Sequence, residues 1–169
     1  MSMHIETFAR TLGIQFSYTT YVFNANLADV SDADAFRAPE PAGNCANWVA
    51  GHIVQARGAT VAMLGQTCPF DLDKYDRYVR GSEPMSAESE GAVPLSEMMA
   101  DFGATVPLLR AGLDELTPEL LGAPAPYSPG NDPDETVGSL LAGVVFHEAY
   151  HTGQLGVLRR VNGNDGALA

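Results

Sequence analysis

The segment HEAYHTGQL, residues 147–155, places two histidines four positions apart within an apolar helical pattern. Four residues at about 100° each return to nearly the same face of a helix, about 6 Å further along its axis. His147 and His151 therefore lie one above the other and can share one metal ion. The first five letters also match the H-E-x-x-H pattern of zinc peptidases. The segment thus raises the question of whether this protein is a peptidase.

The ligand that zinc peptidases place downstream of this pattern is missing from the sequence. The extended peptidase pattern needs a histidine at position 157, where Val157 stands. Other zinc peptidases supply a later glutamate, but no glutamate follows Glu148, and Asp165 lies beyond the helix stop signal at Gly163. We therefore do not expect a peptidase and look upstream for a third ligand.

His52 is the strongest upstream candidate, because it lies in the centre of the apolar stripe of a predicted helix. A buried histidine without partners is costly, since its ring nitrogens need hydrogen bonds. One metal ion would satisfy one nitrogen on each of three rings, so we expect His52, His147 and His151 to bind a divalent metal. Core histidines bonded to carbonyls are the alternative. His4, near the N-terminus, is predicted to be an ordinary surface residue.

Apolar residues at steps of three and four predict four long helices and no convincing strand. The expected ranges are 3–28, 44–64, 95–116 and a fourth helix that is capped by Asp132 or Thr136 and ends before Gly163. Long connections rich in proline and glycine, 65–94 and 117–131, separate the later helices. We therefore predict an all-α, antiparallel four-helix bundle that forms a single domain over residues 1–169.

The composition excludes several classes of partner. Acidic residues outnumber basic ones by 21 to 9, for a formal charge of −12, and no basic cluster occurs. Nucleic acids and anionic membranes are therefore not expected as partners. Neither a signal peptide nor a membrane-spanning segment is recognisable. Cys45 and Cys68 form no C-x-x-C motif and indicate a reducing compartment, so we expect a cytoplasmic protein.

Two segments, NWVAGHIVQAR (47–57) and HEAYHTGQLGVLRRV (147–161), resemble the DinB-like (DinB/YfiT) superfamily of four-helix bundles. The matching elements are a W-x-x-x-H stretch, here Trp48 and His52, and an H-x-x-x-H-x-G-Q-L stretch that begins at His147. The resemblance implies a three-histidine divalent metal site with water in its open positions, and commonly a homodimer. It also points to a low-molecular-weight thiol as co-substrate, because members include transferases and isomerases that use bacillithiol, mycothiol or glutathione.

Three neutral imidazoles would accept zinc, nickel or iron(II) and leave coordination positions open for water or substrate. We therefore expect a metal-dependent enzyme acting on a small molecule, either a thiol-dependent S-transferase or a related hydrolase. The alternative is a non-catalytic, metal-stabilised dimeric bundle that binds a small ligand or acts in stress response.

Two polar residues beside the histidines have open roles. Glu148 is the candidate catalytic residue, as a base on metal-bound water, although it lies about 100° round the helix from His147. A solvated flank residue or a hydrogen-bond partner of an imidazole are the alternatives. Gln154 shares the histidine face, where either a hydrogen bond to a ligand histidine or a helix–helix contact would satisfy its amide.

Overall fold

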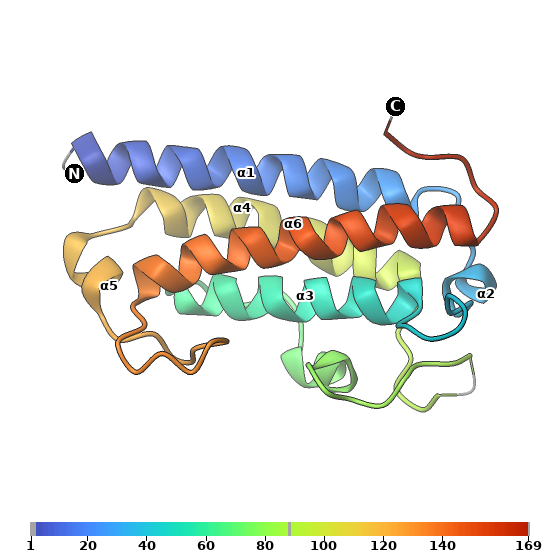
Figure 1. The fold of residues 1–169 in the computed structure, drawn as a ribbon. Coiled ribbons are helices and arrows are strands. Elements are labelled where there is room, and N and C mark those ends of the chain that lie inside the picture. Colours follow the sequence, from blue (N-terminus) through green and yellow to red (C-terminus); the bar gives the residue numbers. More distant parts are fainter. Residues whose placement is uncertain (1–2, 88, 169) are drawn as a thin grey trace.

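The computed structural model describes residues 3–87 and 89–168, which form helices and connections without a β-strand. Within this part of the chain, four long helices make up the bundle (Figure 1): α1 (Met3–Leu27), α3 (Ala46–Met63), α4 (Leu95–Asp114) and α6 (Val137–Val161). The shorter elements are α2 (Asp32–Ala35), the 3₁₀ helix η1 (Leu72–Tyr78) and α5 (Pro118–Gly122). The prediction of an all-helical bundle is confirmed.

The directions of the helices supply an order that the predicted antiparallel bundle left open. Helices α1 and α6 run the same way, and so do α3 and α4 (Figure 1). The hydrophobic core supports these directions. One cluster joins the N-terminal halves of α1 and α6 to the C-terminal halves of α3 and α4, through Leu12, Leu140, Val61 and Leu113. The connection between α3 and α4 is long enough to return along the molecule, so both helices begin at the same end.

The boundaries of α6 depend on Thr136, one of the two predicted caps. Its hydroxyl accepts a hydrogen bond from Ser139 N at 3.2 Å, and the Ser139 hydroxyl accepts one from Thr136 N at 3.0 Å. This reciprocal pair satisfies two backbone donors that the first turn leaves free. The alternative start at Asp132 is therefore wrong. Helix α6 consequently begins at Val137 and carries both histidines near its middle.

Helix α4 continues through Pro107, which lies inside it. The connection that follows it contains α5, whose first turn is capped by the Thr117 hydroxyl accepting from Leu120 N at 3.1 Å. Nothing in the described ranges forms a helix with the length and apolarity needed to cross a bilayer.

Candidate metal centre

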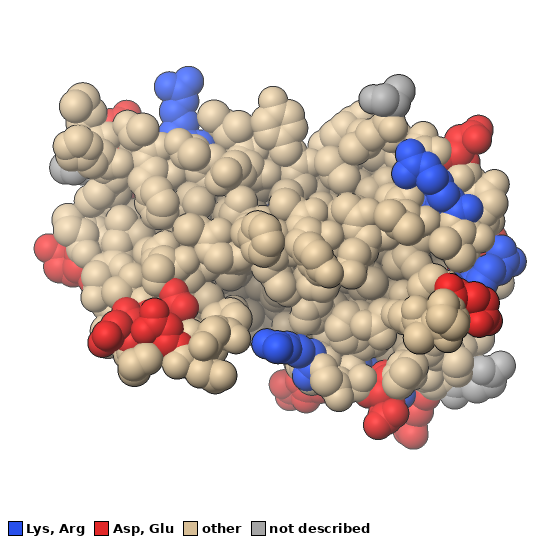
Figure 2. Space-filling view, viewed as in Figure 1, with Lys and Arg blue, Asp and Glu red and all other residues tan. Residues whose placement is uncertain are grey.

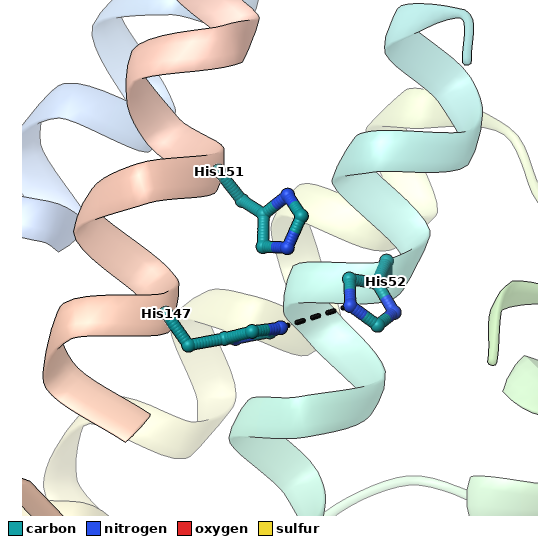
Figure 3. Close-up of side chains that lie close together, drawn as sticks. All are labelled: His52, His147 and His151. Atoms are coloured by element: carbon teal, nitrogen blue, oxygen red, sulfur yellow. Dashed lines mark hydrogen bonds between the residues drawn. The ribbon is translucent and has the colours of Figure 1, made fainter. Parts of the chain in front are cut away.

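Two neighbouring helices bring the three predicted histidines together. His52 lies on α3, while His147 and His151 are one turn apart on α6 (Figure 3). One ring nitrogen from each histidine lies within 4.8 Å of the others. His4, which was predicted to be a surface residue, is exposed and lies outside this group. The helical period thus placed the two α6 histidines on one face, and packing against α3 supplied the third.

The ring of His52 is oriented by the backbone of η1 and by a tryptophan. Its Nδ1 lies 2.7 Å from the carbonyl oxygen of Tyr78. A carbonyl only accepts hydrogen bonds, so Nδ1 carries the proton and Nε2 keeps its lone pair. The His52 ring also stacks against the Trp48 ring, with 4.9 Å between the two ring centroids. The Trp48 side chain is buried and also forms part of this site.

Close packing allows η1 to reach His52. The ring of Tyr78 lies directly over Gly51, where a Cβ would collide with the ring. The Tyr78 hydroxyl donates to the side-chain oxygen of Asn47 at 3.0 Å and accepts from Val93 N at 2.8 Å. These contacts fix the tyrosine at both ends, so its carbonyl is held beside the imidazole. The sequence does contain the glycine, but it does not show which residue would pack there.

His151 is oriented in a similar way by a residue on its own helix. Its Nδ1 lies 2.7 Å from Oε1 of Gln154, whose amide nitrogen donates to the Tyr150 hydroxyl at 3.5 Å. With Oε1 as acceptor, Nδ1 of His151 is the protonated nitrogen and Nε2 is free. Of the two roles considered for Gln154, the hydrogen bond to a histidine of the group, His151, is therefore the one observed.

His147 completes the group, with its Nε2 only 2.9 Å from Nε2 of His52 (Figure 3). Nε2 of His52 carries a lone pair and no proton. A contact this short therefore requires either a proton on Nε2 of His147 or a cation close to both nitrogens. A divalent cation suits three converging imidazoles, which are common ligands of zinc, nickel and iron. The donor set therefore fits a metal ion.

Burial keeps the three rings neutral at physiological pH. Desolvation lowers the pKa of His52, His147 and His151 below the ordinary value of 6.5. The decrease is largest for His147, whose pKa is about 4, because the two other histidines add to the effect of burial. Neutral rings keep the lone pairs that a metal needs, so the electrostatics of the site favour ligation over protonation.

The carboxylate of Glu148 is bound by Arg57 and Thr19, which is not what a base on metal-bound water would need. Its side chain is buried, which contradicts the solvated-flank alternative. Arg57 Nε donates to its Oε2 at 2.7 Å, and both Arg57 Nη2 and the Thr19 hydroxyl donate to its Oε1. The guanidinium carbon lies 5.0 Å from the ring centroid of Phe16 and 4.3 Å from that of Phe102. The carboxylate thus contributes to the packing of α6 against α1 and α3.

The histidines line a cleft of about 1160 Å³ between α3, α6 and their connections. Four aromatic side chains contribute to its walls: Trp48, Tyr127, Phe146 and Tyr150. Among the described residues that line it, Arg80 and Glu135 are the two with formal charges. Figure 2 shows that the face over α6 is largely uncharged and that charged side chains gather towards its margins. The cleft therefore suits a mainly apolar small molecule.

Comparisons with known proteins agree with this geometry. The sequence model of the DinB superfamily matches residues 15–155. A solved structure, described as a conserved protein from Enterococcus faecalis, is similar with a TM-score of 0.68 and 19% sequence identity, and the match covers 95% of this chain and 97% of that one. At this identity the likeness concerns the fold alone. A search of curated proteins finds no match.

Proposed function

The chain belongs to the DinB superfamily, and we propose that its three histidines form a divalent metal site at the centre of a metal-dependent enzyme. Superfamily membership and the grouping of His52, His147 and His151 fit a metal-binding protein. The observation that carries the proposal is the orientation of the rings. In His52 and His151, Nδ1 is engaged by a protein acceptor, and Nε2 is left to face the common centre.

The proposed metal is zinc, nickel or iron(II), since neutral imidazoles accept all three. When bound with open positions, such an ion holds a thiolate or lowers the pKa of a bound water towards about 7. The protein supplies the rest of the site. The Tyr78 carbonyl and Gln154 orient two of the rings, and Trp48 covers one side of His52.

The proposed reaction is the transfer of a low-molecular-weight thiol to an electrophile, or a related hydrolysis. The support is an open cleft beside three neutral ligands, with aromatic walls that can pack against the apolar body of a small molecule. An apolar cleft also reduces the competition from water for an activated thiolate. Elemental analysis of protein purified without chelators should find about one divalent metal per chain.

A panel of thiols tests the reaction directly. Bacillithiol, mycothiol and glutathione would each be mixed with a bromobimane-type electrophile, with metal-loaded protein and with protein treated with a chelator. A metal-dependent rate with one thiol, lost in His52→Ala, supports the transferase. If none of the thiols gives a metal-dependent rate although the metal is bound, the transferase proposal fails.

A non-catalytic metal-stabilised bundle is the second candidate, and the position of Glu148 favours it. The acidic residue nearest in sequence to the ligands is engaged by Arg57 and Thr19. The one acidic residue that lines the cleft in the described structure, Glu135, accepts hydrogen bonds from Ser128 and Ser139. Under this proposal, chelation lowers the melting temperature while no reaction is found for the metal-loaded protein.

A homodimer is part of the proposal, and the exposed face of α1 and α6 supports it. These two helices lie side by side in the bundle (Figure 1). Tyr18 and Tyr21 on α1 are 69% and 62% exposed, and Phe146 and Tyr150 on α6 are 72% and 57% exposed. Large exposed apolar side chains on adjacent helices are typical of a surface that is covered in an assembly. We therefore propose this face as the dimer interface.

A further inference from the structure

We propose that Arg80 binds an anionic group on the small molecule that occupies the cleft, so that the ligand combines an apolar body with a carboxylate. The inference rests on the proposed function, because it assigns a class of ligand to the same site. It follows from the charge of the cleft, from the way the chain holds Arg80 in place and from the lack of a counterion for this residue in the described structure.

The charges that line the cleft single out Arg80. Of the described lining residues, Arg80 carries a permanent positive charge, and Glu135 carries the one formal negative charge. The Glu135 carboxylate already accepts hydrogen bonds from two serine hydroxyls. The protein has a net charge of −12, so an anion is repelled by the molecule as a whole and needs a local cation to enter. A guanidinium meets this need and matches the geometry of a carboxylate.

A tight turn at the end of η1 presents Arg80. Ser82 N donates to the carbonyl of Val79 at 3.1 Å and closes the turn, with Arg80 and Gly81 at its two central positions. Gly81 has a φ of +84°, a conformation that a side chain at this position would strain. The turn therefore places the arginine at its tip, where the side chain is exposed towards the cleft.

Two hydrogen bonds attach this turn to α3 on either side of Arg80. The carbonyl of Tyr78, two residues before it, accepts from Nδ1 of His52 at 2.7 Å. The hydroxyl of Ser82, two residues after it, accepts from Nε1 of Trp48 at 2.9 Å. The backbone that carries Arg80 is thus fixed to His52, which belongs to the histidine group, and to Trp48, which stacks on it. A backbone held in this way reduces the entropy lost when a ligand binds.

Arg80 has no counterion within the described residues. Three other basic residues form ion pairs there: Arg57 with Glu148, Arg37 with Asp34, and Lys74 with both Glu97 and Asp101. Neither an ion pair nor a side-chain hydrogen bond to Arg80 is found in residues 3–87 and 89–168. Its guanidinium is therefore free to bind a ligand, while the aromatic walls of the cleft pack against the apolar part.

A matched pair of probes tests the inference. 3-Phenylpropanoate and its uncharged analogue 3-phenylpropanamide have the same apolar body and differ in the carboxylate. Trp48 is the single tryptophan of the chain and lines the cleft, so its fluorescence reports binding. We expect the carboxylate to bind roughly 3–10-fold more tightly than the amide, the range for a partly exposed charge-assisted contact. The titrations use protein as purified and protein treated with a chelator, because a carboxylate can also bind a metal.

Three variants test whether Arg80 causes the preference for the carboxylate probe over the amide probe. In the chelator-treated protein, Arg80→Gln should abolish the preference for the carboxylate, and Arg80→Lys should keep part of it. Arg110→Gln, which changes an exposed arginine on α4 that does not line the cleft, should keep all of it. Equal affinity for the two probes in the unaltered protein, binding of neither probe, or a preference that survives Arg80→Gln would each overturn the inference. Metal content is measured on the same samples, so failure of the metal site is recognised separately from failure at Arg80.

Discussion

Arg57 and Glu148 form an ion pair inside the bundle, with Arg57 Nε donating to Glu148 Oε2 at 2.7 Å. Their side chains are 0% and 3% exposed. Glu148 follows a proposed metal ligand directly in the sequence, yet a step of about 100° along α6 turns its carboxylate away from the cleft and into the core. The sequence pattern that resembles a zinc peptidase therefore serves two separate purposes here, a histidine group on one face and a core ion pair on the other.

We predict that removing one member of this pair destabilises the protein more than replacing both. Arg57→Met, Glu148→Leu or Glu148→Gln alone should lower the free energy of unfolding by roughly 3–5 kcal/mol, since each leaves a buried charge or donor without its partner. Arg57→Met combined with Glu148→Leu should recover much of that loss. Urea unfolding of the single and double variants measures the coupling.

An exposed ion pair gives the matched control for this experiment. Glu97→Gln removes one of the two carboxylates that contact Lys74 near the surface and should cost at most about 1 kcal/mol. The metal content of Glu148→Gln separates the two roles considered for this residue. If the variant loses its metal or its reaction while its unfolding free energy is unchanged, Glu148 acts at the metal centre rather than in the core.

We predict that each histidine of the group is needed for metal binding. His52→Ala, His147→Ala and His151→Ala should each bind zinc at least about 100-fold more weakly, because two imidazoles rarely make a tight site. His4→Ala should bind normally, since His4 is exposed and lies outside the group. Competition with a chromogenic chelator measures the affinities. Normal zinc affinity in two of the three variants would contradict a shared site.

Gln154 should tune the metal affinity through His151. Gln154→Leu removes the acceptor that holds the proton on His151 Nδ1, so the ring is free to rotate or to change tautomer. Loss of such a partner typically weakens metal binding by roughly 10–100-fold. Gln55→Leu is a suitable control, because Gln55 also lines the cleft but makes no side-chain hydrogen bond to a site histidine in the described structure. Equal zinc affinities of the two variants would show that the Gln154 contact has no effect on the metal.

The sequence was sufficient to predict the histidine group because helical periodicity is a local property. His147 and His151 share a face through their spacing, and His52 stood out as a polar residue within an apolar stripe. The partners of these residues could not be predicted, because tertiary packing decides them. The Tyr78 carbonyl reaches His52 only because η1 packs over Gly51, and Arg57 meets Glu148 from 91 positions away.

The helix directions show the same limit. Alternating directions are the simplest arrangement for four helices with short connections. The sequence showed that the connection between α3 and α4 is long, but not that it runs back along the bundle and makes these helices parallel. The path depends on contacts such as that of Asn47, whose amide donates to the Val93 carbonyl at 2.9 Å just before α4 begins.

We predict that acidification lowers the free energy of unfolding of the metal-free protein at pH values where most carboxylates are still ionised. The pKa of His147 is about 4 in the folded protein, against an ordinary value of 6.5. Between these values the unfolded chain binds more protons than the folded one, so stability is greatest above pH 6.5 and falls as the pH decreases towards 4. Urea unfolding of chelator-treated protein at several pH values measures this slope. His147→Phe should reduce the slope, and an unchanged slope would show that His147 does not titrate as described.

Charge placed on the exposed face of α1 should prevent the proposed dimer. Tyr18→Asp combined with Tyr21→Asp introduces two negative charges into an apolar surface on a protein that already carries a net charge of −12. These two residues do not line the cleft, so metal binding should be unaffected. We expect sedimentation to show a dimer for the unaltered protein and a monomer for the double variant. Met3→Asp is the matched control, because Met3 is 75% exposed at the far end of α1. An unaltered protein that sediments as a monomer at high concentration would contradict the dimer, and a double variant that stays dimeric would place its interface on another face.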